Sequence, residues 1–157
     1  MSKTPLYFIK KLSSHDLGER DGEIYARNCW FSLQTAPTLK FFFNIDAENI
    51  TEVENVEYDY SFQMPNVLDP EIIYLNVRRR ENTLIFVLKV NSLARVMQLL
   101  PNEIFVIEQK APEQFAIKIM KIDHPNYVRI NDLLTIKERN IIRNKPIQIC
   151  TNINPFD

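Results

Sequence analysis

The run FIKKLSSHDLGERDGEIYARNCWFSL, residues Phe8–Leu33, has a polar middle that contains the chain's only two glycines, Gly18 and Gly22. Apolar, strand-like segments flank this middle on both sides. Glycine is used where the backbone takes a positive φ or approaches another group closely, so this loop is conformationally special. A plain hairpin connection would explain such glycines. The loop also carries two hydroxyls, an imidazole, an arginine and four carboxylates, which suits contact with another polymer's polar edges.

The first half of this run resembles a known motif. From Lys10 to Gly18 it reads Lys-Lys-Leu-Ser-x-x-Asp-x-Gly. This is similar to the opening of the DNA-binding pseudobarrel at the N-terminus of EcoRII-type restriction endonucleases. That B3-like fold also occurs in plant transcription factors and in LlaJI-type, McrBC-like restriction systems. The resemblance implies an open β-barrel with two arms that grip the DNA major groove, one arm being this loop. The family continues with Gly-His-Gln-x-Gly, where this chain has Arg20-Asp21-Gly22-Glu23.

Composition fits a binding module more easily than an enzyme. At 157 residues and 18.6 kDa, with 45% hydrophobic residues, the chain is long enough for one well-packed domain. Length therefore predicts one domain, residues 1–157, and the resemblance implies that it is a DNA-binding domain, the N-terminal part of a larger restriction protein. Two glycines are too few for a P-loop or a GxGxxG turn, so nucleotide chemistry is not expected, and we predict no cofactor.

The cysteines indicate the compartment. Cys29 and Cys150 lie in apolar surroundings, and they belong to no pattern of metal-ligand spacing. No secretory signal precedes them, and no apolar run reaches transmembrane length. We therefore expect reduced thiols in a cytoplasmic protein without a metal site.

Charge is unevenly distributed along the chain, although the net charge is only −1. Residues 41–77 contain eight acidic side chains and no Lys or Arg, whereas the other 120 residues hold all 19 basic side chains against 12 acidic ones. The balance outside the acidic stretch is therefore +7, from 19 minus 12. A solvated edge explains the acidic stretch without any function. Such polarity would also orient the protein in the field of DNA.

A coarse pass along the chain predicts mostly strands with two helices. The strands are expected where Ile, Val, Phe or Tyr cluster between Pro, Asn and Asp, at 6–11, 24–33, 38–45, 57–63, 71–78, 83–90, 103–110, 115–122 and 147–151. One helix should begin at a cap residue Asn91 or Ser92 and stop at Pro101. A second should begin at Asn131 and continue through Ile142. This order favours a mainly β fold, an open barrel with two helices, over an alternating βαβ fold.

Three consecutive arginines lie between two apolar runs, Ile72–Val77 and Thr83–Leu88. This pattern predicts a hairpin whose tip, residues 78–82, carries the arginines. Three like charges are easier to understand beside phosphates or guanine edges, because arginine binds both with its planar fork. A solvated tip beside the acidic stretch is the alternative. By its order along the chain, the hairpin corresponds to the family's second arm.

Enzymatic and single-strand-binding interpretations fit less well. A PD-(D/E)xK nuclease pattern can be traced through Asp69, Glu108 and Lys110, but so widely spaced a match arises easily by chance. His15 and His124 lie far apart, and no Ser or Cys has a nucleophile context. The aromatic runs Trp30-Phe31 and Phe41-Phe42-Phe43 could stack on bases, but their place in predicted strands favours core packing.

The sequence therefore predicts a non-catalytic, sequence-specific double-stranded DNA-binding module of a bacterial restriction system, which delivers a nuclease or translocase domain to its target. Phosphate and guanine contacts are expected from Lys10, Lys11, Arg20, Arg78, Arg79 and Arg80. Finer base discrimination is expected from Ser13, Ser14, His15, Asp16, Glu19, Asp21 and Asn82. The rival is a protein-interaction barrel that docks through its acidic stretch.

Overall fold

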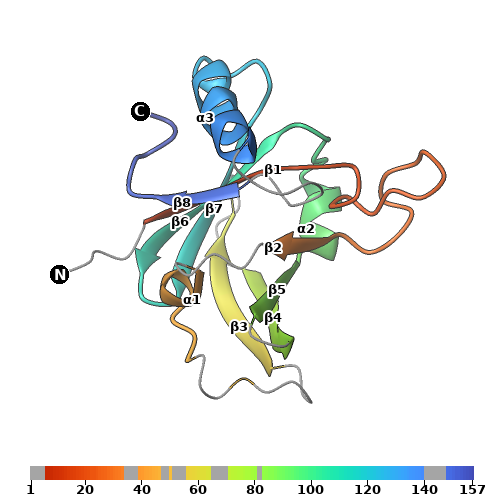
Figure 1. Cartoon of the computed structure of the whole chain (residues 1–157). Coiled ribbons are helices and arrows are strands. Elements are labelled where there is room, and N and C mark those ends of the chain that lie inside the picture. Colours follow the sequence, from red (N-terminus) through yellow and green to blue (C-terminus); the bar gives the residue numbers. More distant parts are fainter. Residues whose placement is uncertain are drawn as a thin grey trace.

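One β-sheet organises the structure, a computed structural model that describes residues 6–33, 39–46, 50, 56–64, 71–80, 83–139 and 148–157. Eight strands in these ranges pair in the order β2-β5-β4-β3-β7-β6-β1-β8. They are β1 Tyr7–Lys11, β2 Trp30–Leu33, β3 Val56–Gln63, β4 Glu71–Arg80, β5 Thr83–Lys89, β6 Ile104–Ala111, β7 Gln114–Met120 and β8 Gln148–Thr151. The helices are α1 Leu39–Phe42, α2 Asn91–Val96 and α3 Tyr127–Arg139 (Figure 1).

The sheet curls into an open barrel. Its neighbouring strands are antiparallel except β3 and β7, which are parallel. The strand order begins with β2 and ends with β8, and in the described residues these two edges are not paired, so a seam stays open. The predicted fold class, a mainly β open barrel with two helices, is confirmed, with α1 as one additional turn.

Two apolar clusters explain why β1 is buried on both faces. Phe8 points into the barrel, where it packs in the main core with the aromatic rings of α1 and β7. Tyr7 and Ile9 point the other way, into a smaller cluster that α3 covers with Ile130 and Leu134. Successive strand residues face opposite sides, so a run of apolar residues is required wherever both sides are covered. The apolar run Tyr7–Ile9 therefore has no polar residue because α3 covers the side of β1 that faces away from the barrel core.

Most predicted strands are confirmed, but two are wrong. Of the predicted strand 24–33, only Trp30–Leu33 is a strand, and the preceding residues belong to the loop. The predicted strand 38–45 contains the helical turn α1 instead. Leu39, Phe42 and Phe43 are all fully buried, and their spacing of three and four residues places them on one helical face. A run of phenylalanines is therefore compatible with either element, and here the core selects the helix.

Both predicted helices exist with shifted ends. Val90 occupies the N-cap of α2 without a side-chain hydrogen bond, and the helix ends at Val96, before Pro101. The positive φ of Gln98, 53°, turns the chain there. Helix α3 begins at Tyr127, four residues before the predicted Asn131, and the last residues of the prediction, 140–142, lie outside the described residues. None of the helices in the described ranges has the length and apolar character needed to span a bilayer.

Candidate nucleic-acid interface

The segment between β1 and β2, residues 13–28, is here called the glycine loop, and it folds as an irregular hairpin. Backbone N–H groups of Tyr25 and Arg27 donate to the carbonyls of Leu17 and Gly18 at 2.7 and 3.0 Å. At the tip, Arg20 and Glu23 exchange two backbone hydrogen bonds of 2.9 and 3.1 Å. The two residues between them, Asp21 and Gly22, both have positive φ, 54° and 86°, as a tight type I′ hairpin turn requires. In Figure 1 the loop projects beyond α2.

Gly18 is required at its position for two reasons. Its φ is +69°, in agreement with the expectation from the sequence. In addition, a Cβ atom there would lie only 2.3 Å from the carbonyl oxygen of Arg27, a backbone atom on the opposite side of the loop. Gly22 also has a positive φ, but no atom lies within 4 Å of the position of its added Cβ. The first glycine therefore sets the shape of the loop, and the second serves only its turn.

A buried ion pair holds the base of the loop. The Nζ of Lys10 lies 3.3 Å from Oδ2 of Asp16, and the two residues are only 1% and 4% exposed. Ser13 and Asp16 also bond each other reciprocally, each backbone N–H donating to the other's side-chain oxygen at 2.9 and 3.2 Å. Burial lowers the pKa of Lys10, and the neighbouring carboxylate of Asp16 opposes this change. Neither Lys10 nor Asp16 reaches the surface, so we reassign both from DNA contact to holding the loop.

Helix α2 braces the far side of the loop. The hydroxyl of Tyr25 donates to the carbonyl of Leu99 and lies 3.3 Å from that of Ala94, while Arg95 donates to the Tyr25 carbonyl at 2.9 Å. Burial raises the pKa of Tyr25 above its usual value. Tyr25 itself has a φ of 65°, a left-handed conformation that an ordinary side chain adopts only when its surroundings enforce it. These contacts tie the loop to α2 and the residues that follow it.

The remaining predicted residues of the loop are accessible. Those with exposed side chains are Ser13, Ser14, His15, Arg20 and Asp21, and Lys11 and Glu19 are half-buried. The carboxylate of Glu19 accepts a 2.6 Å hydrogen bond from the backbone N–H of Gly22. The backbone carbonyl of Glu19 accepts a second hydrogen bond, of 3.1 Å, from the guanidinium of the exposed Arg27. Sequence reasoning overlooked Arg27, although its position in the same polar run could have indicated it.

The arginine hairpin, β4 and β5, differs from the prediction. Its pairing continues to Arg80 opposite Thr83, so the arginines belong to a strand rather than to a five-residue tip. Arg78 is exposed on the outer face, whereas Nε of Arg79 donates to the carbonyl of Ile50 at 3.1 Å. Neighbouring strand residues face opposite sides, so the first two guanidinium groups cannot act together. The side chain of Arg80 and all of Asn82 lie outside what the structure describes.

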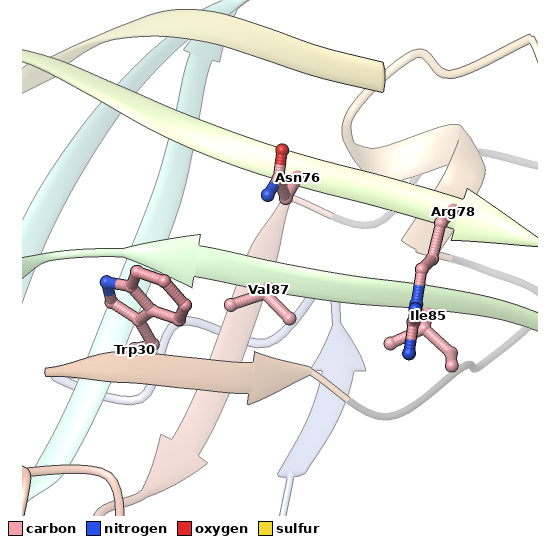
Figure 2. Close-up of a pocket in the computed structure, with 5 residues that line it drawn as sticks. All are labelled: Trp30, Asn76, Arg78, Ile85 and Val87. Carbon is pink, nitrogen blue, oxygen red and sulfur yellow. The ribbon is translucent and has the colours of Figure 1, made fainter. Parts of the chain in front are cut away.

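The outer face of β2, β5 and β4 carries a shallow hollow of about 190 Å³, lined by Trp30, Asn76, Arg78, Ile85 and Val87 (Figure 2). Trp30 is 44% exposed, so the expectation that Trp30-Phe31 packs in the core is wrong for Trp30 and correct for the fully buried Phe31. The outward turn of Trp30 follows from strand alternation.

The glycine loop and the paired end of the arginine hairpin lie at opposite ends of this face. The loop enters β2 at Trp30, which pairs with Lys89 at one end of β5, and Thr83 pairs with Arg80 at the other end (Figure 1). Beside the face, Glu57 on β3 is neutralised by Lys89, whose Nζ lies 3.0 Å from the Glu57 carboxylate. The face between the two projections therefore combines an aromatic ring, an amide and basic groups.

The structure gives a different role to the residues of the nuclease pattern. Lys110 and Lys118 lie 2.6 and 3.9 Å from the carboxylate of Glu108. Burial by itself would raise the pKa of Glu108, but the hydrogen bond from Lys110 and the two lysine charges outweigh it, so the pKa lies below its usual value. Asp69 lies outside the described residues, within which no group of three or more metal-ligating side chains occurs.

A larger hollow, of about 310 Å³, opens on another part of the surface, between α3, β1 and the end of the chain. None of the predicted site residues lines it. Of the predicted residues that are exposed, Arg78 lies on the face of β2, β5 and β4, and Ser13, Ser14, His15, Arg20 and Asp21 belong to the glycine loop.

Comparison with known proteins identifies this architecture. No family model matches the chain, and no curated protein matches it. Solved structures that are similar to it include two that each share 11% sequence identity with it. The Arabidopsis FUS3-DNA complex matches with a TM-score of 0.52, covering 72% of this chain and 94% of that one. The N-terminal domain of Helicobacter pylori LlaJI.R1 matches with a TM-score of 0.51, covering 92% and 98%.

The chain has a B3-like pseudobarrel fold. The resemblance found in the short motif from Lys10 to Gly18 therefore extends over most of the chain's architecture. An open seam, as between β2 and β8 in the described residues, is consistent with this fold.

Proposed function

We propose that this chain is a sequence-specific double-stranded DNA-binding module that holds the major groove between the glycine loop and the arginine hairpin. One observation carries the proposal: the glycine loop, rich in exposed polar side chains, and the paired end of the arginine hairpin, near Arg78, lie at the two ends of one exposed sheet face. The similar fold of a protein solved in complex with DNA supports it.

The spacing of the two projections suits a duplex. At a rise of about 3.3 Å per residue, β5 from Lys89 to Thr83 covers about 20 Å. This is wider than the major groove, which measures about 12 Å. A duplex seated on the face can therefore be contacted from both sides, by the loop at one end and the hairpin at the other.

The accessible side chains divide into two roles. Lys11, Arg20, Arg27 and Arg78 supply positive charge to phosphates or guanine edges. Ser13, Ser14, His15 and Asp21 present hydrogen-bonding groups to base edges, where sequence is read. The module itself performs no chemistry in this proposal. It delivers a nuclease or translocase domain, in the same polypeptide or on a partner, within a restriction system, as the likeness to the LlaJI.R1 N-terminal domain suggests.

The first experiment measures how duplex affinity depends on salt. Arg20→Ala and Arg78→Ala should each lower affinity and reduce the salt slope by about 0.9 for each phosphate that the variant no longer neutralises. Arg129→Ala is the matched control, because this exposed arginine lies on α3, away from the face. Equal slopes in the folded Arg20 and Arg78 variants and in the control would contradict the proposal. A wild type that shifts no duplex at low salt would favour the protein-interaction barrel instead.

The second experiment distinguishes recognition of a base sequence from general electrostatic attraction to DNA. Bound sites are selected from a randomised duplex library with the wild type and with His15→Ala. The substitution should cost about 1–3 kcal/mol on the selected site and much less on random duplex, because base contacts carry sequence information and phosphate contacts do not. If the wild type enriches no motif, or if the variant enriches the same motif equally strongly, the loop does not read sequence.

A further inference from the structure

The hollow between the two projections has a chemical character that general DNA attraction does not explain. Val87 and Ile85 line it with aliphatic groups, and Figure 2 shows Trp30 and Arg78 at its two ends with Val87 between them. Asn76 contributes an amide from β4. Exposing a tryptophan beside aliphatic side chains is unfavourable in water, so this surface is suited to an apolar group of a ligand.

Among the groups that DNA presents in its major groove, only one is apolar. It is the C5 methyl group of a pyrimidine, present in thymine and in 5-methylcytosine, whereas the other groups there are hydrogen-bond donors and acceptors. Arginine binds guanine O6 and N7, and asparagine binds adenine N6 and N7. An aliphatic surface with Arg78 at one end and Asn76 beside it is therefore complementary to a pyrimidine methyl next to a purine.

The surroundings of Trp30 favour this occupant over an extruded base. The ammonium of Lys89 lies 5.2 Å from the centre of the indole ring, over one of its faces. An extruded base is held in a closely fitting pocket by stacking between side chains, whereas this hollow is shallow and open. The indole is thus better placed to flank a methyl group than to sandwich a base.

We propose that the hollow formed by Trp30, Ile85 and Val87 receives the C5 methyl group of a pyrimidine beside a guanine that Arg78 contacts. The inference rests on the proposed DNA-binding function and adds a specificity to it: the module senses whether one base of its site carries a methyl group. Both thymine and 5-methylcytosine supply that group, and the experiment distinguishes them.

The experiment starts from the site selected in the randomised library. Each thymine in turn is replaced by uracil, which removes only the methyl group, and each cytosine in turn by 5-methylcytosine, which adds it. Affinity is measured with the full chain, and emission is recorded from Trp30, the chain's only tryptophan. At one position, loss of the methyl from thymine or its addition to cytosine should change affinity by about fourfold, the effect of burying one methyl-sized group. Substitution at that position should also change the emission of Trp30.

Two variants locate the effect. Trp30→Ala should bind methylated and unmethylated duplexes with equal affinity. Tyr74→Ala is the matched control, because this exposed ring lies on the same face, opposite Lys89, but does not line the hollow. It should keep the wild-type preference.

The outcomes separate this inference from the function on which it rests. If the site is bound with the expected salt dependence but no methyl change alters affinity, the inference is wrong and the proposed function stands. An effect of methylation that persists in Trp30→Ala places the methyl group elsewhere and also overturns it. If no duplex is bound at all, both fail together.

Discussion

The glycine loop and the arginine hairpin lie at opposite ends of one face, yet their shapes are maintained in different ways. The hairpin is a regular ladder of paired residues that continues to Arg80 opposite Thr83. The loop has only short stretches of pairing and depends on individual groups: one glycine, one buried ion pair and one tyrosine. A substitution in the hairpin should therefore act locally, whereas a substitution at an anchor of the loop should change its whole shape.

The largest expected effect is that of Asp16→Ala. This change leaves the ammonium of Lys10 buried without its partner and removes the acceptor of the Ser13 N–H. Breaking a buried pair on one side costs about 3–5 kcal/mol. Urea unfolding should show this loss. Ser14→Ala, at another exposed position of the same loop, is the control and should stay within about 0.5 kcal/mol of the wild type. Similar losses in both variants would show that the ion pair does not anchor the loop.

The next effect compares the two glycines. Gly18→Ala and Gly22→Ala both place a side chain at a positive φ, so this conformational cost, about 1–2 kcal/mol, is common to them. Only Gly18→Ala also forces a Cβ against the Arg27 carbonyl, and such overpacking adds about 1–3 kcal/mol. Thermal melts and binding to the selected site should both rank the Gly18 variant as more damaged. Equal melting temperatures would mean that the loop relaxes freely and is not fixed in one shape.

In the hairpin, side chains alternate between the two faces of β4, so Arg79 should contribute to stability and Arg78 to DNA binding. Arg79→Ala removes the hydrogen bond to Ile50 and should lower stability by about 1 kcal/mol. Arg78→Ala removes an exposed side chain and should leave stability within about 0.5 kcal/mol of the wild type while weakening DNA binding. Urea unfolding and duplex titration of both variants test this. The opposite pattern would mean that the register of β4 is shifted by one residue.

The sequence predicts the hairpin better than the loop. The hairpin follows from the local pattern of apolar residues, whereas the loop depends on contacts between residues far apart in the sequence. The apolar runs on either side of Arg78 are local signals, and they locate β4 and β5 within a few residues. They do not reveal how far the pairing extends, so they predict the arginines at a tip instead of in a strand. In the loop, the glycines mark a special conformation correctly, but the partners of Asp16 and Tyr25 cannot be read from composition.

The errors at Lys10 and Trp30 have one cause. Charge predicts Lys10 on the surface, and aromatic character predicts Trp30 in the core, and the structure reverses both. Each is placed by the alternation of its strand and by what covers that side, which depends on segments far away in sequence. The glycine loop closes over Lys10, whereas no described segment covers the outer face beside Trp30. A residue type thus predicts burial only where the covering element is known.

The smallest predicted effect is a pH dependence of stability that comes from Lys10, at the base of the glycine loop. The pKa of Lys10 is lowered by burial below its ordinary 10.5. Between the folded-state pKa and 10.5, the unfolded chain therefore binds a proton that the folded chain has released. In that window the free energy of unfolding should rise with pH because of this group. Lys10→Met lacks the titrating group. The free energy of unfolding of the wild type, minus that of the variant, should therefore increase as the pH rises towards about 10.5. Parallel pH profiles for the wild type and Lys10→Met, from urea unfolding across this range, would show that Lys10 is solvated and that the base of the loop is open to water.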